Sequence, residues 1–190
     1  MAIDPEKGSR TFADYVALAI ATCGVGYFPL APGTLGALVG VGLYLTIWGS
    51  VLRILEVNAV RGHLSLLYIF TPLTAAMLLG ISLVTIAGTW AATRAEKVMQ
   101  RKDPSAVVID EVAGQMIALL AGPFWLPTWW SILTAFILFR LFDIWKPYPI
   151  RRFEALESGL GIMADDVLAG IYALIVNSLL IAGYLLIFPH

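Results

Sequence analysis

Long apolar runs constrain this chain more than any other feature of its sequence. A helix that crosses a lipid bilayer needs about 20 mostly apolar residues, with a range of roughly 17–25. The segments that reach or approach this length are Leu35 to about Leu52, Leu64 to about Ala92, about Val107 to Leu126, Trp129 to about Trp145, and Val167 to Phe188. The sequence therefore predicts an all-α fold, a multi-pass integral membrane bundle with about five membrane-embedded helices.

Composition supports this class of protein and excludes others. Of the 190 residues, 59% are hydrophobic and 13% are charged, whereas a soluble domain carries roughly 25% charged residues. The length fits one domain over residues 1–190. A net charge of -1 gives no reason to expect nucleic acid as a partner. Cys23 is the single cysteine, so it cannot form an internal disulfide, and we expect it to contribute to packing.

Two stretches differ from simple spanning helices. Phe12 to Thr22 is apolar but too short to cross, so we expect a short N-terminal interfacial helix that lies on the membrane surface or re-enters it. Asp110 and Glu111 interrupt the third apolar segment, which we therefore expect to span poorly or to lie partly buried against its neighbours. We expect no cleavable signal peptide, because the first apolar stretch is short and leads into glycines and a proline.

The basic residues indicate how the bundle is oriented. With the N-terminus inside and five crossings, all of the 12 Lys and Arg residues except Arg53 and Arg61 fall on the cytoplasmic side. Cytoplasmic loops of membrane proteins carry an excess of Lys and Arg, so this arrangement is favoured. Trp125, Trp129 and Trp130 then gather at the outer turn, as interfacial aromatic residues do.

Carboxylates gather at one level of this topology, on the cytoplasmic side. The acidic residues concerned begin the third span, end the fourth and begin the fifth; they are Asp110, Glu111, Asp143, Asp165 and Asp166. Ionisable groups within membrane helices are costly and usually mark function. We therefore expect these three helix ends to converge on one functional site.

Helix caps or snorkelling surface charges are the structural alternative for these carboxylates. This alternative fits Asp165 well, because Asp165 could cap the last helix. It fits Asp110 and Glu111 poorly, because Asp103-Pro104 resembles an N-cap with a first-turn proline more than a turn earlier. It also fits Asp143 poorly, because that residue stands between two apolar side chains.

A positive partner is needed to hold clustered carboxylates together. Hard oxygen ligands suit Mg²⁺, which often binds one or two carboxylates, keeps several waters and takes its remaining ligands from substrate phosphate. No histidine or cysteine lies near these residues in the sequence. We therefore expect all of the carboxylates named above to be candidate Mg²⁺ ligands, and either one cation or two would fit them.

Two cations on the fourth span could hold a phosphoryl group beside these carboxylates. Arg140, Asp143 and Lys146 are spaced i, i+3 and i+6, so they share roughly one helical face. Arg140 and Lys146 could bind phosphoryl oxygens. An intrahelical ion pair with Asp143 is an equal alternative for Arg140, whereas Lys146 at the helix end favours the substrate role.

The start of the first span is a further candidate for binding substrate. It consists of Pro32, Gly33 and Thr34, and Thr34 can cap the helix. Backbone N–H groups at a helix N-terminus attract anions. The feature is weak alone and gains weight because it lies at the same membrane level as the carboxylates.

Side chains that other phosphatases use as nucleophiles are missing near this site. His63 falls in an outer loop and His190 is the last residue, while no arginine follows Cys23 at phosphatase spacing. No Asp-x-Asp sequence occurs, which removes the usual aspartyl-phosphate arrangement. Water activated by a metal is the remaining nucleophile.

Four segments together resemble the phosphatidylglycerophosphatase A family in their order and spacing. They are GVGYFPLAPGTLG from Gly24, VIDEVAG from Val108, FRLFDIWKPYPI from Phe139 and GLGIMADDVLAG from Gly159. Ala37 stands where the family commonly has serine, and Tyr148 where it commonly has tryptophan. Neither departure touches a candidate ligand.

The resemblance implies Mg²⁺-dependent hydrolysis of an anionic lipid, phosphatidylglycerophosphate, to phosphatidylglycerol and phosphate. It implies a site that faces the cytoplasm at the bacterial inner (plasma) membrane, among membrane lipids. Lys146 and Thr34 fall within matching motifs. By position the family's acidic residues correspond to the five carboxylates; of the residues in these motifs, we expect catalysis to depend on Asp110, Glu111, Asp143, Lys146 and Asp166.

Two other functions are alternatives. A CDP-alcohol phosphotransferase also uses membrane aspartates and Mg²⁺, but its long Asp-Gly…Ala-Arg…Gly…Asp…Asp pattern does not occur here. An ion or proton transporter would also use intramembrane carboxylates, although it should place them near the bilayer midplane, often at broken helices. Carboxylates at one membrane edge favour an interfacial enzyme.

Overall fold

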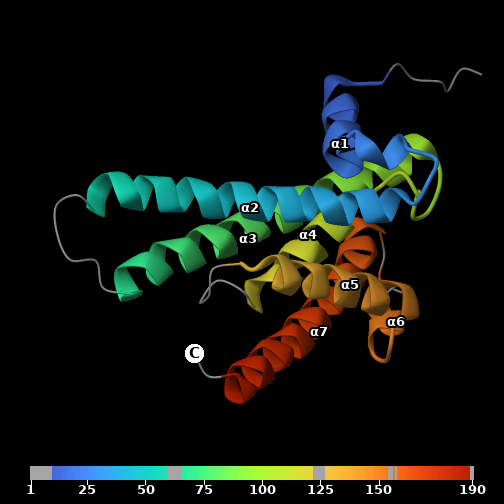
Figure 1. The fold of residues 1–190 in the computed structure, drawn as a ribbon. Helices are drawn as coiled ribbons and strands as arrows, with labels where there is room; N and C mark the ends of the chain where they lie inside the picture. The colour runs from blue at the N-terminus through green and yellow to red at the C-terminus, as the bar shows by residue number, and fades with distance from the viewer. Residues whose placement is uncertain (1–9, 60–65, 122–126, 154–155, 157, 189–190) are drawn as a thin grey trace, which may run out of the picture.

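The regular elements in the described part of the chain are all helical. The computed structural model describes residues 10–59, 66–121, 127–153, 156 and 158–188 (Figure 1). The helices are α1 (Phe12–Thr22), α2 (Pro32–Ala59), α3 (Leu66–Met99), α4 (Ile109–Ala118), α5 (Trp129–Trp145), α6 (Ile150–Phe153) and α7 (Ser158–Ile187). Short 3-10 turns, η1 (Val25–Tyr27) and η2 (Leu119–Ala121), follow α1 and α4. The described part of the chain contains no strand, which confirms the all-α class.

Three of the described helices, α2, α3 and α7, are long and apolar enough to cross a membrane. α5 has the predicted bounds, and its 17 residues reach only the lower limit of roughly 17 for a spanning helix. α4 has 10 residues, and at about 1.5 Å per residue it is about half as long as the hydrocarbon core is thick. The count of about five membrane-embedded helices is therefore not confirmed and stays a prediction.

The short helix α4 is the centre of the bundle. Every residue of α4 except Glu111 is buried, and the helix packs against α2, α3, α5 and α7. Val112 and Met116 belong to an apolar cluster shared with α1 and α3, while Ala118 belongs to a second cluster shared with α2, α5 and α7. The expectation that this segment lies buried against its neighbours is confirmed.

The helix ends that carry or flank the candidate site residues lie at one end of the bundle. In Figure 1 the start of α2, the carboxyl end of α5, α6 and the start of α7 all lie toward the right, and α1 lies at this same end. The carboxyl end of α7 lies toward the opposite end. The predicted convergence of helix ends is therefore present in the fold.

α1 has the predicted bounds, and its own sequence explains both ends. Thr11 and Asp14 form a capping box at its start, in which the Asp14 carboxylate accepts a hydrogen bond from the Thr11 N–H (2.7 Å). Cys23 ends the helix in the left-handed region (φ 47°) and packs against the apolar cluster of α1, α3 and α4. The predicted packing role of Cys23 is confirmed.

Two predicted helix starts are wrong. Asp103-Pro104 does not begin a helix: the Asp103 N–H donates to Glu96 Oε1 (2.9 Å), the chain stays irregular up to Val108, and α4 begins only at Ile109. α7 begins at Ser158, so Asp165 lies inside the helix and does not cap it. Asp165 and Asp166 interrupt the apolar run of this segment but not its helix. The start predicted from the apolar run, Val167, is therefore too late.

Several residues on which the sequence predictions depend lie outside the described residues. They are Arg61, His63, Leu64, Trp125, Leu126 and His190.

Candidate metal centre

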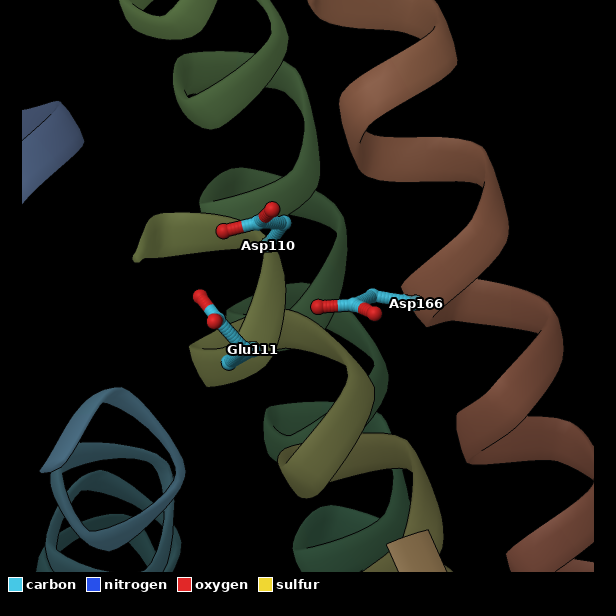
Figure 2. Close-up of side chains that lie close together, drawn as sticks. All are labelled: Asp110, Glu111 and Asp166. Atoms are coloured by element: carbon cyan, nitrogen blue, oxygen red, sulfur yellow. The ribbon is translucent and has the colours of Figure 1, made fainter. Parts of the chain in front are cut away.

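Three carboxylates from α4 and α7 form a compact acidic cluster. Asp110 and Glu111 lie in the first turn of α4, and Asp166 lies inside α7. One carboxylate oxygen of each residue lies within 4.8 Å of the other two. Figure 2 shows Asp166 reaching from α7 toward the two side chains on α4. Asp110 is 9% exposed and Asp166 is 4% exposed. The structure thus gathers Asp110, Glu111 and Asp166 from among the predicted ligands.

Glycines let the helices that carry this cluster touch backbone to backbone. A Cβ on Gly170 of α7 would overlap the carbonyl group of Gly114 in α4, and a Cβ on Gly114 would lie 2.5 Å from the carbonyl oxygen of Asp166. A Cβ on Gly33, at the start of α2, would overlap the Glu111 carboxylate. Close helix packing in lipid relies on such small residues. These contacts bring the start of α2 and the side of α7 up to the cluster.

Asp143 and Arg140 of α5 lie beside the acidic cluster. Arg140 Nη1 is 2.5 Å from Asp143 Oδ2 and 4.0 Å from Glu111 Oε1. Asp143 is close enough to Glu111 and Asp166 to interact electrostatically with both. The intrahelical pair, one of the two alternatives for Arg140, is therefore present, and the same guanidinium also faces the cluster.

Lys146 and Asp165 form a second ion pair at the same end of the bundle. Lys146 Nζ is 2.7 Å from Asp165 Oδ2. Lys146 also closes α5 in the left-handed region (φ 46°), where its N–H donates to the Phe142 carbonyl oxygen (2.8 Å). Asp165 is 7% exposed, and the carboxylate that faces Lys146 is not part of the compact cluster. The cation that sequence reasoning assigned to substrate thus holds a candidate metal ligand in this structure.

The charges of this site fit a bound cation. Two cations, Arg140 and Lys146, face the five carboxylates, so three negative charges stay unneutralised when every carboxyl is ionised. Repulsion between two carboxylate charges about 5 Å apart is on the order of 3 kcal/mol at an effective dielectric constant of about 20. Within the described residues, Asp110 Oδ1 and Glu111 Oε2 are buried and have no hydrogen-bond partner. Buried charged oxygens require a partner, and a hard divalent cation supplies one.

The start of α2 lies against the cluster but is built differently from the prediction. α2 begins at Pro32, and the N–H groups of Thr34 (3.0 Å) and Leu35 (3.3 Å) donate to the Ala31 carbonyl oxygen. Thr34 therefore lies inside the first turn and does not take the capping position that the sequence offered it. Gly33 is the residue of this turn that touches the site, because it faces both Glu111 and Arg140. The positive end of the α2 dipole is thus close to the acidic cluster.

One buried polar residue next to the cluster was missed by the sequence analysis. Gln115 follows Glu111 by one helical turn in α4, is 0% exposed, and neither of its side-chain polar atoms has a partner in the described part of the chain. A glutamine inside an apolar segment, four residues after a candidate ligand, was the signal that could have identified it.

This chain is similar to a known family and to named bacterial proteins. The sequence model of the family described as Phosphatidylglycerophosphatase A matches residues 18–181. A Haemophilus influenzae protein named Phosphatidylglycerophosphatase A is 42% identical over 154 residues, which cover 80% of this chain and 80% of that protein. An Escherichia coli protein of the same name is 31% identical over 154 residues, which cover 78% of this chain and 73% of that protein.

A third relative carries a different name. It is a Bacteroides thetaiotaomicron protein provisionally named as a phosphatidylinositol-3-phosphatase, and it is 41% identical over 155 residues, which cover 80% of this chain and 84% of that protein. No solved structure matches this chain.

Proposed function

Because this chain belongs to the phosphatidylglycerophosphatase A family and is thus a phosphoric monoester hydrolase, we propose that it hydrolyses phosphatidylglycerophosphate to phosphatidylglycerol and phosphate with bound Mg²⁺. The observation that carries this proposal is the acidic cluster with its unpartnered buried oxygens on Asp110 and Glu111. These oxygens are the ligands that a hard cation prefers. The family match supports the reaction, and the cluster supports the need for a metal.

The carboxylates of the site have different proposed roles around the cation. Asp110, Glu111 and Asp166 would hold the ion, because their oxygens lie close together. Asp143 would be a further ligand beside them, and Asp165 would contribute to the site through Lys146. A bound Mg²⁺ supplies a water of lowered pKa and neutralises charge on the phosphoryl oxygens.

Cations and the start of α2 bind the phosphoryl group. Arg140 already lies 4.0 Å from Glu111, so a phosphate placed at the cluster meets this guanidinium, which binds two oxygens at once. Gly33 and its neighbours Pro32 and Thr34 contribute the positive end of the α2 dipole. Lys146 exchanges its contact with Asp165 for a phosphoryl oxygen.

The reaction breaks the bond between phosphorus and the glycerol oxygen. Water adds its oxygen to phosphorus and gives up a proton to a carboxylate of the acidic cluster. The glycerol oxygen leaves and takes up a proton, which yields phosphatidylglycerol and inorganic phosphate. Preorganised charge at the phosphoryl oxygens is the main source of acceleration in this type of transfer.

The membrane setting of the site is also part of the proposal. Three helices long enough to cross a bilayer support a place for the chain in the inner membrane, and the excess of Lys and Arg at this end of the bundle supports a cluster that faces the cytoplasm. The lipid headgroup then approaches from the membrane surface while its acyl chains stay in the bilayer. Because the carboxylates lie at one end of the bundle, this setting suits an interfacial enzyme better than a transporter.

Phosphate release from defined lipids tests the substrate. Purified protein with Mg²⁺ receives phosphatidylglycerophosphate or phosphatidylinositol 3-phosphate in mixed micelles, and kcat/KM is measured for each. We expect phosphatidylglycerophosphate to be preferred, with Asp166→Asn slower by on the order of 10²–10³ and the exposed Glu56→Gln, in the carboxyl-terminal part of α2, normal as the control. A preference for the phosphoinositide would move the function toward that of the Bacteroides relative. Ion flux through liposomes without phosphate release from either lipid would favour the transporter.

A further inference from the structure

A groove between α1 and α3 shares no residue with the acidic cluster. Its volume is about 750 Å³, and the side chains that give it its character are Asp14 of α1 and Ile86, Trp90, Arg94 and Lys97 of α3. The proposed phosphatase reaction assigns no role to any of them. The groove lies near the carboxyl end of α3, where the spanning helix leaves its apolar stretch.

The groove changes from apolar to cationic along one helix face. Ile86, Trp90, Arg94 and Lys97 are separated by four, four and three residues, so they line the same side of α3. Ile86 is 71% exposed and Trp90 is 44% exposed. Along α3 the groove is thus first apolar, then lined by tryptophan, and finally basic. A lipid presents its acyl chain, glycerol and phosphate in the matching order.

The charge inside the groove is positive. Arg94 Nε is 2.6 Å from Asp14 Oδ1, and Arg94 Nη2 is 3.0 Å from the Thr11 hydroxyl. Hydrogen bonds from the hydroxyl and N–H of Thr11, together with Arg94, lower the pKa of Asp14 to about 2, so Asp14 is ionised at neutral pH. The Asp14 carboxylate balances the charge of Arg94, and the positive charge of Lys97 remains. Within the described residues, the Lys97 ammonium has no ion-pair or hydrogen-bond partner.

We propose that this groove binds one anionic phospholipid, with its phosphodiester at Lys97 and Arg94 and an acyl chain along Trp90 and Ile86. Asp14 and Thr11 hold the Arg94 guanidinium in place, so the cation is positioned before the lipid arrives. Basic pockets at the cytoplasmic ends of membrane helices bind anionic headgroups in this way, with about 1 kcal/mol per Lys or Arg near the surface. The occupant is a lipid diester, and its binding is independent of the acidic cluster and of hydrolysis.

Quenching of Trp90 by brominated lipids tests this site directly. The full-length protein is placed in micelles that contain phosphatidylglycerol or phosphatidylcholine with brominated acyl chains, without Mg²⁺ or substrate. The Trp90 contribution is the difference between the parent protein and Trp90→Phe. We expect phosphatidylglycerol to quench Trp90 at lower mole fraction than phosphatidylcholine, and Lys97→Gln to weaken that preference about fivefold.

Lys102→Gln is the matched control, because Lys102 is exposed, lies beyond α3 and does not line the groove. It should keep the parent preference. Equal quenching by both lipids, or a preference that Lys97→Gln leaves unchanged, would overturn the proposal and leave Lys97 as a cation that only stabilises the end of α3. Protection of Trp90 from every lipid, together with a dimer in solution, would also overturn it, because a second copy would then cover the groove.

Discussion

At the scale of single residues, the carboxylates of the site divide by whether all of their buried oxygens have a partner. Asp143 and Asp165 have Arg140 and Lys146. Asp110 and Glu111 retain buried oxygens without a partner among the described residues. An unpaired buried carboxylate is costly, so the second pair depends most on a bound cation. The sequence predicted all of these residues but not this division, because pairing depends on which side chains α5 and α7 bring together.

Substitutions at the carboxylates should follow the division by partner. Asp110→Asn, Glu111→Gln and Asp166→Asn should each lower kcat/KM by on the order of 10²–10³ and remove stabilisation by Mg²⁺, by analogy with the loss of a group that stabilises the transition state. Asp165→Asn should cost about 10–100-fold, as for a residue that acts through a neighbour of the metal. Phosphate-release kinetics and Mg²⁺-dependent melting measure the two effects. An equal and complete loss at Asp165 would make it a direct ligand.

Lys146 combines a backbone role with a charge role, and two substitutions separate them. Lys146 itself adopts a positive φ, which strains lysine and alanine alike, so Lys146→Ala removes the charge and leaves this strain, whereas Lys146→Asn removes the charge and relieves it. Both variants should raise the activation free energy for kcat/KM by about 2.7–4 kcal/mol, because the ammonium contacts a phosphoryl oxygen mainly in the transition state. Lys146→Asn should have the higher melting temperature of the two. Near-normal activity of Lys146→Asn would return Lys146 to a purely structural partner of Asp165.

At the scale of helices, the sequence predicted the central parts of the helices better than their ends. α1 and α5 have the predicted bounds, because their apolar runs stop at clear breaks. Asp103-Pro104 resembles a helix start, but the Asp103 N–H donates to Glu96 near the end of α3 and α4 begins only at Ile109. The start of α7 was misplaced because Asp165 and Asp166 are buried by neighbouring helices, which a hydropathy run cannot register. Ends that meet other helices are the ones that local sequence describes least well.

Helix contact through glycine gives a sharp test at this scale. Gly170→Ala should destabilise the protein by about 1–3 kcal/mol, because its Cβ would overlap the Gly114 carbonyl group and force α4 and α7 apart. Gly183→Ala, in the same helix with open space around it, should be neutral or slightly stabilising. Thermal melting of both variants without Mg²⁺ checks the contrast. Equal melting temperatures would show that α4 and α7 do not touch at Gly170.

At the scale of the whole molecule, a short buried helix organises the longer ones. α4 lies among α2, α3, α5 and α7, so the first turn of α4 presents its acidic residues where the other helices end. The class of fold followed from apolar runs, and the gathering of carboxylates at one end followed from their positions in those runs. The burial of a short helix at the centre was only partly foreseen, because burial by protein and burial by lipid give the same apolar sequence.

Orientation in the membrane is a whole-molecule prediction from the basic residues. The segments around Arg101 and Arg151 should face the cytoplasm and the segment around Arg61 should face outward. Single cysteines introduced at these positions on a Cys23→Ala background are treated with an impermeant thiol reagent in intact cells. Only the Arg61 position should react before the cells are opened. Labelling at Arg101 but not at Arg61 in intact cells would show the opposite orientation, with the acidic cluster on the outer side of the membrane.

The most direct test of the central claim is phosphate release from phosphatidylglycerophosphate during a Mg²⁺ titration after chelation. We predict no release in excess chelator, recovery of release as Mg²⁺ is added, and a parallel rise in melting temperature, because an ion that binds only the folded protein adds about 2.7 kcal/mol of stability at 100 times its Kd. The Asp110→Asn variant should lose both responses together. Full phosphatase activity in excess chelator would contradict the account, because the acidic cluster would then have no cation to hold.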